Sequence, residues 1–216
     1  MNLLNSPAGR TRSPAFTLTE LLTVVSIIAI LTSLLFAVVG TARNAARRAG
    51  AKADLMNLVA AIKAYQQEYG VYPLSRASEA DVTEVTFSID NSDLCNTLRA
   101  IPQGANKNNV LNPRRIAFLE VPDAKNQADP HNGIANGNWY DPWGRQPGKP
   151  ESGIYHVRID AANRGFVSDP YPGADKDDDW GGTAEKAVIR TGVIAWSLAK
   201  TGIQTYELKD QVLSWK

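Results

Sequence analysis

Residues 21–39 read LLTVVSIIAILTSLLFAVV, and none of these nineteen residues carries a charge. At a rise of about 1.5 Å per residue, an α-helix of this length extends roughly 28 Å, close to the hydrocarbon thickness of a bilayer. The polar members carry hydroxyls that can bond to carbonyls of their own helix, which makes them tolerable in lipid: Thr23, Ser26, Thr32 and Ser33. The stretch therefore predicts a membrane-spanning helix, with a buried core helix as the alternative.

The composition of the whole chain excludes several classes of protein. Its 216 residues include 23 Lys and Arg against 22 Asp and Glu, and the net charge of +1 argues against a nucleic-acid binder that acts through a basic surface. The 44% hydrophobic and 21% charged residues exclude a disordered chain. The single cysteine, Cys95, excludes an internal disulfide framework and a cysteine-based zinc site. We interpret it as a small buried hydrophobic residue.

Three kinds of N-terminal segment compete for this position. A secretory signal peptide begins with basic residues, which Arg10 and Arg12 supply, but its apolar core is only about 7–15 residues long. A plain signal anchor fits the length, yet it gives no reason for Glu20 at the edge of the apolar run. A carboxylate that enters lipid costs about 2–3 kcal/mol, so we expect Glu20 to have a partner.

The residues around Glu20 read Ser13-Pro14-Ala15-Phe16-Thr17-Leu18-Thr19-Glu20-Leu21-Leu22. They resemble the processing signal of type IV prepilins and type II secretion pseudopilins. The resemblance implies that residues 1–15 are a leader that is removed, that Phe16 becomes an N-methylated N-terminus, and that Glu20 is the fifth mature residue. The family usually has Gly before the cut, where this chain has Ala15. Because alanine is the next smallest side chain, we expect slower cleavage rather than none.

The same resemblance implies a role for Glu20 in assembly. In a filament of packed helices, the Glu20 carboxylate of one subunit would pair with the Phe16 amine of a neighbour. Such a pair adds little net stability, but breaking it leaves a charge stranded in apolar surroundings. We therefore expect Glu20 to set the register between subunits. The alternative is an interfacial glutamate that extends to the lipid headgroups.

The helix is expected to continue beyond the membrane as an amphipathic segment over residues 41–70. Apolar residues recur there at spacings of three and four: Leu55, Leu58, Val59, Ile62, Tyr65 and Tyr69. Gly70 then supplies a C-terminal cap and Pro73 forbids continuation. The sequence Tyr69-Gly70-Val71-Tyr72-Pro73 resembles the end of this helix in the G class of type II secretion pseudopilins.

One feature opposes the orientation that the resemblance implies. Four cations follow the apolar run and outnumber Arg10 and Arg12 before it: Arg43, Arg47, Arg48 and Lys52. The positive-inside rule by itself would place the C-terminal part in the cytoplasm. We give precedence to the cleavage motif, which implies a periplasmic head.

Residues 71–216 are expected to form an α+β head. A short helix is predicted over residues 91–101, capped by Asn91 or Ser92, with one face formed by Leu94, Cys95, Leu98 and Ile101. Alternation predicts strands over residues 154–159 and 193–198, with a third near 212–215. Residues 126–138 are interpreted as irregular loop because they are rich in turn-forming residues. The fold class is thus α+β, a long N-terminal helix packed on a small antiparallel sheet.

A second motif supports the same family. Asp141-Pro142-Trp143-Gly144 resembles the segment that leads into the first strand of G-class pseudopilins. Physically, Asp141 can form an Asx turn, Pro142 fixes φ, and Gly144 turns the chain. Trp143 is expected to pack the head against the long helix.

Calcium is the only cofactor for which the sequence offers candidates. Asp175, Asp177 and Asp179 have the spacing that opens a calcium loop, although the later positions do not fit an EF-hand. The family's own calcium loop would correspond to residues 197–202, which contain no acid, leaving Asp210 as the nearest carboxylate candidate beside the loop carbonyls. A solvated acidic loop is the alternative.

An enzyme finds little support in the sequence. Of the two histidines, His131 lies in the expected loop and His156 on the expected polar side of a strand, and no serine or glycine-rich motif suggests a nucleophile or a phosphate site. A signal-anchored binding domain that never polymerises is another reading, with Trp139, Trp143 or Trp180 exposed for ligands. A type IV pilus subunit is a third, but its usual C-terminal disulfide loop needs more than one cysteine.

The resemblance as a whole implies a type II secretion pseudopilin in the bacterial inner membrane, crossing it once with residues 16–40. Its expected partners are copies of itself and other pseudopilins in a helical filament, the prepilin peptidase, the inner-membrane secretion platform and membrane lipid. No nucleic-acid partner is expected.

Overall fold

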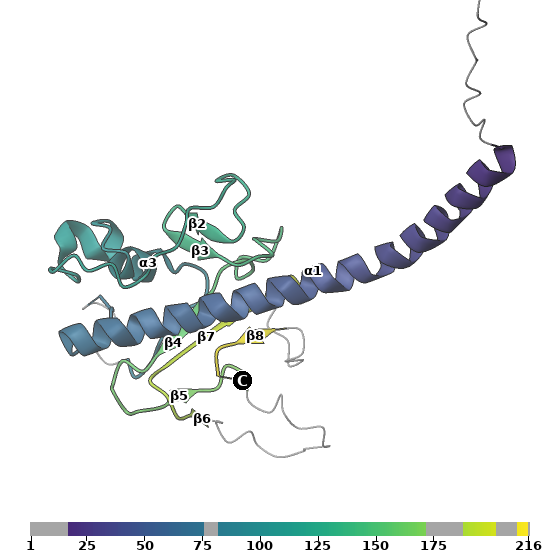
Figure 1. The fold of residues 1–216 in the computed structure, drawn as a ribbon. Coiled ribbons are helices and arrows are strands. Elements are labelled where there is room, and N and C mark those ends of the chain that lie inside the picture. The colour runs from purple at the N-terminus through teal and green to yellow at the C-terminus, as the bar shows by residue number, and fades with distance from the viewer. Residues whose placement is uncertain (1–16, 76–81, 172–187, 202–210, 216) are drawn as a thin grey trace, which may run out of the picture. The chain divides into compact units, whose positions relative to one another are not determined.

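The computed structural model describes residues 17–75, 82–171, 188–201 and 211–215. Within these residues the α-helices are α1 (Leu18–Tyr69) and α3 (Ser92–Leu98), and 3₁₀ turns lie at Gly104–Asn109, where a kink interrupts the turn, and at Ala199–Thr201. The strands are β1 (Val85–Phe87), β2 (Gly133–Ala135), β3 (Asn138–Tyr140), β4 (His156–Ile159), β5 (Val167–Ser168), β6 (Val188–Ile189), β7 (Val193–Ser197) and β8 (Val212–Leu213) (Figure 1).

The chain divides into two compact units between Asn44 and Ala45, and α1 runs through both. In the first unit the hydroxyls of the apolar run are satisfied within the helix, because Thr23, Ser26, Thr32 and Ser33 each donate to a carbonyl of the preceding turn. Ser26 Oγ lies 2.8 Å from Leu22 O, and Thr32 Oγ1 lies 2.6 Å from Ile28 O. This agrees with the bonding expected from the sequence.

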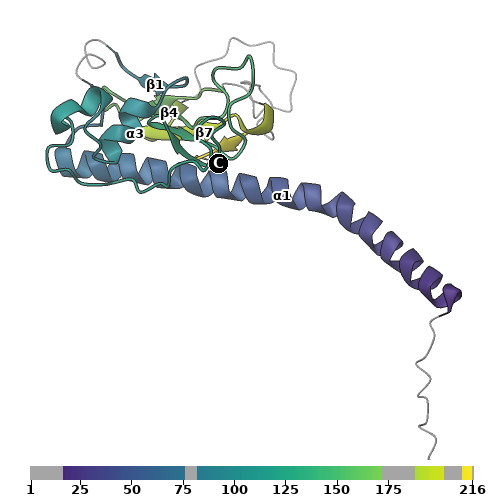
Figure 2. The same cartoon turned by 90° about the horizontal axis from the view of Figure 1, so that it is seen from above.

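The second unit is built on the C-terminal half of α1. Of the predicted stripe, Leu55, Leu58, Ile62 and Tyr65 are buried, whereas Val59 and Tyr69 are partly buried against the same cluster. In both views, β4 and β7 lie alongside this half of the helix (Figures 1 and 2). The helix ends at Tyr69, where Gly70 takes a φ of +73° and its N–H donates to Gln66 O at 2.8 Å. The predicted glycine cap is therefore confirmed.

The main sheet is antiparallel, with strand order β1-β4-β7-β8. One face joins the cluster formed with α1, through Tyr155, Val157 and Ala195 among others. The other face forms a second cluster: Val167, Tyr171, Ile194, Trp196, Leu198 and Leu213. The predicted α+β architecture is confirmed, and β1, which the sequence did not reveal, extends the sheet at one edge.

The second cluster overturns one expectation. His156, expected on the polar side of its strand, is buried and stacks on Trp196 with ring centroids 5.3 Å apart. Its Nε2 lies 2.8 Å from Glu151 O. Since both faces of β4 are covered, alternation along this strand does not separate buried from exposed positions.

The expected loop at residues 126–138 contains a hairpin. Strands β2 and β3 pair in register Ile134↔Trp139, and the turn between them is Asn136-Gly137, with φ of +49° and +82°. Two consecutive positive φ values are the signature of the turn that suits the twist of paired strands. The Asn-Gly pair was the sequence signal for this hairpin.

Asn91 does not cap α3 with its side chain, as the sequence suggested. Its Nδ2 donates to Tyr155 O at 2.8 Å, and its Oδ1 accepts from Trp139 N at 2.9 Å. Asp90 takes part at the helix start instead, accepting from Ser92 N at 2.8 Å. Behind Asn91, Cys95 is fully buried as expected, and burial raises the pKa of its thiol to about 12.

We predict that Asn91→Ala destabilises the head by about 3 kcal/mol, because it leaves two buried backbone groups without a partner, the N–H of Trp139 in β3 and the carbonyl of Tyr155 just before β4. The measurement is urea unfolding of the detergent-solubilised full chain, followed by tryptophan fluorescence. Asn57→Ala, on the exposed face of α1, is the matched control and should change stability by less than about 0.5 kcal/mol. Equal losses in both variants would contradict the buried bridging role.

Candidate functional site

Glu20 lies in the first turn of α1 and forms a reciprocal pair with Thr17. Its Oε2 accepts from Thr17 N at 2.9 Å and from Thr17 Oγ1 at 2.7 Å, while Glu20 N donates to Thr17 Oγ1 at 3.2 Å. This is a capping box, in which two otherwise unpaired N–H groups at the helix start are satisfied. The Thr-x-x-Glu spacing was the sequence signal for it, and the partner expected for Glu20 includes Thr17 of its own chain.

After Glu20 the helix presents apolar side chains on every side. The large hydrophobic residues between Leu18 and Leu35 are between 48% and 81% exposed. Within the described residues, α1 is long and apolar enough to cross a membrane, as the length and composition of residues 21–39 predicted. Ala15 and Phe16, the residues of the expected cleavage site, lie outside the described residues.

Two of the four cations that follow the apolar run serve the head. Arg48 Nη2 donates to Gln211 O at 2.8 Å, and Lys52 Nζ donates to Leu213 O at 2.5 Å. These bonds fasten the last strand, β8, to α1. Arg48 and Lys52 therefore have a structural role in the head. Their position after the apolar run does not need the positive-inside rule to explain it. Arg43 and Arg47 are exposed.

The Asp141-Pro142-Trp143-Gly144 motif forms the Asx turn that the sequence predicted. Asp141 Oδ1 accepts from Trp143 N at 2.9 Å and from Gly144 N at 3.0 Å. Gly144 has a φ of +68°, and a Cβ there would lie 2.6 Å from the His131 ring, so only glycine fits. Trp143 packs against the core cluster that contains the α1 stripe.

Asp141 is also tied to the sheet. Its Oδ2 accepts from Ser197 Oγ at 2.6 Å, and Ser197 Oγ in turn accepts from Ala199 N at 2.9 Å. Both residues are fully buried. Burial raises the pKa of Asp141 to about 6, although the hydrogen bonds from Ser197, Trp143 and Gly144 oppose that shift. The motif is thus a buried connection between the hairpin and β7.

The calcium candidates lie outside the described residues: Asp175, Asp177, Asp179 and Asp210. Within the part of the chain that the structure describes, no group of three or more His, Cys, Asp or Glu side chains is arranged to hold a metal. Ser197, the first residue of the stretch aligned with the family's calcium loop, turns inward to Asp141.

The three tryptophans that the sequence offered as exposed ligand-binding residues differ in their burial. Trp139 is buried, at 2% exposure, and packs edge-on against Tyr155 with ring centroids 5.0 Å apart. The expectation of an exposed Trp139 is therefore wrong, because β3 turns this side chain toward the core. Trp143 is half-buried, and Trp180 lies outside the described residues.

Comparison with protein-family models, with curated proteins and with solved structures finds no match. Function is therefore inferred from the residues and contacts described above.

Two buried groups give the head opposing pH dependences. Between about pH 4 and pH 6, folded Asp141 holds a proton that the unfolded chain has released, so its contribution to stability falls as pH rises. Burial lowers the pKa of His156 to about 4, so folded His156 stays neutral where the unfolded chain is protonated, and its contribution rises with pH. In the wild type the two effects largely offset each other.

We predict that Asp141→Asn leaves the contribution of His156 without its counterpart. Between pH 4 and pH 6 the free energy of unfolding of this variant should therefore rise by on the order of 3 kcal/mol more than that of the wild type. His156→Gln should show the reverse slope. Urea unfolding of the full chain at a series of pH values measures both, with Glu120→Gln, an exposed carboxylate, as control. Parallel curves for all variants would contradict the assignment.

Proposed function

We propose that this protein is a pseudopilin subunit of a type II secretion system. It would be held in the bacterial inner membrane by the first half of α1, with the head in the periplasm, until prepilin peptidase removes residues 1–15. The processed chain would then assemble with copies of itself and other pseudopilins on the inner-membrane secretion platform, forming a filament that drives protein export.

The single observation that carries the proposal is the continuity of α1. One helix of 52 residues begins with a capped glutamate, continues through apolar residues exposed on all sides, and ends as an amphipathic segment on which the head is built. An apolar helix that needs lipid in one state can be covered by identical helices in another. A simple anchor needs no continuation into the core of the head.

The capping box is compatible with a contact between subunits. Both bonds from Thr17 are made to Oε2 of Glu20. Among the residues that the structure describes, Oε1 of Glu20 has no partner, so it can accept from the Phe16 amine of a neighbouring subunit while the cap remains. The alternative of a type IV pilus subunit gains no support from Cys95, which is buried in the core.

The proposal predicts how the N-terminus is processed. Protein purified from membranes of cells that contain prepilin peptidase should begin at N-methylated Phe16, and mass spectrometry of the intact chain and of its N-terminal peptide measures this. Ala15→Gly should increase the processed fraction, because it restores the residue that the family usually has before the cut. An intact Met1, or a cut after Val39, would overturn the proposal.

Substitutions at Glu20 and Thr17 can separate the charge of Glu20 from its role in capping α1. Glu20→Gln retains a side chain that can cap the helix but removes the charge, whereas Thr17→Ala removes the capping hydroxyl and retains the charge. If the charge pairs with a neighbour, Glu20→Gln and Glu20→Ala should each reduce filament number at least tenfold. Thr17→Ala should assemble to within about threefold of wild type.

Filaments are counted by negative-stain electron microscopy after co-expression with the secretion platform. Tryptophan fluorescence should show an unchanged head in all three variants, since every tryptophan lies between residues 139 and 215. Normal filaments from Glu20→Gln would refute the charge role. Loss of filaments in Thr17→Ala alone would identify the cap as the requirement.

A further inference from the structure

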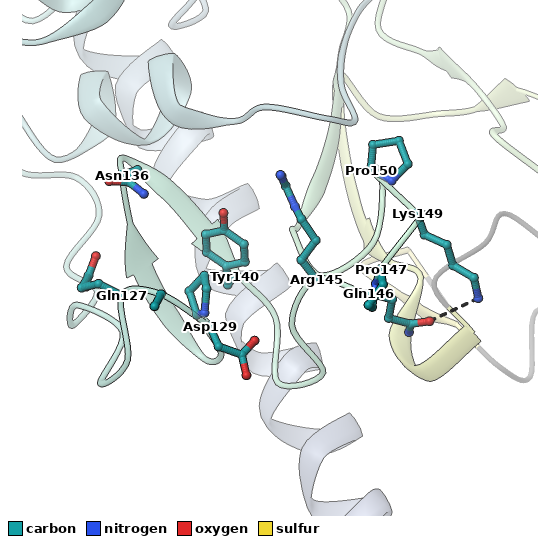
Figure 3. Close-up of a pocket in the computed structure, with 12 residues that line it drawn as sticks. Gln127, Asp129, Asn136, Tyr140, Arg145, Gln146, Pro147, Lys149 and Pro150 are labelled. Atoms are coloured by element: carbon teal, nitrogen blue, oxygen red, sulfur yellow. Dashed lines mark hydrogen bonds between the residues drawn. The ribbon is translucent and has the colours of Figure 1, made fainter.

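A pocket of about 630 Å³ lies beside the β2–β3 hairpin and is lined by none of the residues used in the proposed function. One wall comes from the loop around Asp129 and the hairpin turn at Asn136, and the other from residues 145–150. Figure 3 shows Tyr140 between the two walls, with Arg145 facing it from the other side. The volume is within the range of small-molecule sites.

The position of Tyr140 in the pocket wall points to a ligand. The residue is 93% buried, at 7% exposure, and it lines the pocket. Among the described residues its hydroxyl makes no hydrogen bond, so the hydroxyl is available to a ligand in the pocket. In Figure 3 the hydroxyl and the Arg145 guanidinium point to the same side. A ligand seated there could contact both groups.

Arg145 gives the pocket a site for an anion. Its guanidinium lies 5.9 Å from the centre of the Tyr140 ring, and its one hydrogen bond within the described residues is a long one, 3.4 Å to Ile89 O. Asp90 is near enough to interact with Arg145, but its carboxylate accepts from Ser92 N. Lys149, whose Nζ donates to Gln146 Oε1 at 3.2 Å, adds a second positive charge to the same wall.

The opposite wall favours hydroxyl groups over a second negative charge. Asp129 is exposed there, with His131 Nδ1 3.8 Å from its Oδ1, and its carboxylate can only accept hydrogen bonds when ionised. A polyanion would be repelled by Asp129, whereas a ligand with one carboxylate and several hydroxyls satisfies both walls. Such a ligand has the chemistry of a sugar acid.

The pocket is fixed before any ligand arrives. On the Arg145 side, Ser152 Oγ accepts from Gln146 N and donates to Lys149 O, each at 2.7 Å. On the Asp129 side, Asn126 Oδ1 accepts from Ala128 N at 3.0 Å. A preorganised site loses less entropy when a ligand binds.

An extended peptide is a poorer fit. Peptide recognition by strand addition needs a free sheet edge. Here β2 already pairs with β3 on one side and bridges Asp123 on the other, and β3 also bridges Ile154. A compact ligand is therefore favoured over an added strand.

The geometry points to this pocket as a binding site for a uronic acid residue of an acidic saccharide, with Arg145 and the Tyr140 hydroxyl taking the carboxylate and Asp129 accepting from the sugar hydroxyls. The site is independent of the proposed role in secretion, because it uses neither Glu20 nor the apolar half of α1.

The test is isothermal titration calorimetry of the detergent-solubilised full chain with a trisaccharide made of one galacturonic acid and two galactose units, which carries a single carboxylate. Binding should be at least tenfold tighter than that of the uncharged galactose trisaccharide. Arg145→Gln and Tyr140→Phe should each weaken it about tenfold, because each removes a hydrogen bond to a charged group. Tyr140→Phe retains the ring, so the packing of the hairpin is kept.

Arg115→Gln is the matched control, since it removes an exposed arginine outside the pocket and should leave binding unchanged. The proposal is overturned if the trisaccharide fails to bind at millimolar concentration, or if Arg115→Gln weakens binding as much as Arg145→Gln. Tighter binding of a triglutamate peptide than of the acidic trisaccharide would also overturn it, by showing a peptide site instead.

Discussion

The head depends on the hydrogen bonds and apolar contacts that fasten its elements to one face of α1. Along the apolar stripe, polar side chains of the helix reach to segments far along the chain. Asp54 accepts from Tyr155 Oη at 2.7 Å, next to β4, and Tyr69 Oη donates to Asn112 Oδ1 at 2.7 Å. With Arg48 and Lys52 at β8, these contacts fix the sheet and the 112 loop against the helix. Burial raises the pKa of Asp54, and the bond from Tyr155 partly opposes this.

The elements set by local rules were predictable from the sequence. The stripe from Leu55 to Tyr65 and the glycine at residue 70 are enough to define the second half of α1 and its end. The length and composition of residues 21–39 likewise define an apolar helix. Each of these features depends on residues close together in the chain, so spacing alone carries the information.

The misassigned residues depend on distant segments. His156 is covered by Trp196, which in turn contacts Tyr171. Neither residue is near His156 in the sequence, so local alternation could not predict this burial. Asn91 has the right type and position for a helix cap, but its side-chain amide instead hydrogen-bonds to the backbone of Trp139 and Tyr155. The capping role of Glu20 and the hairpin at Asn136-Gly137 are different, because local signals for both were present. The pocket near Tyr140 could not be predicted, since its walls meet only after the hairpin has formed.

Arg48 and Lys52 have a consequence for how the head forms during synthesis. Their contacts with Gln211 and Leu213 close loops of 163 and 161 residues, and β8 is the last element of the chain. Contacts between residues so distant form slowly and only after the intervening chain is available. All of α1 is therefore synthesised while its C-terminal half still lacks its final strand. Formation of α1 can thus precede closure of the head, so the order of synthesis separates two processes that share one helix.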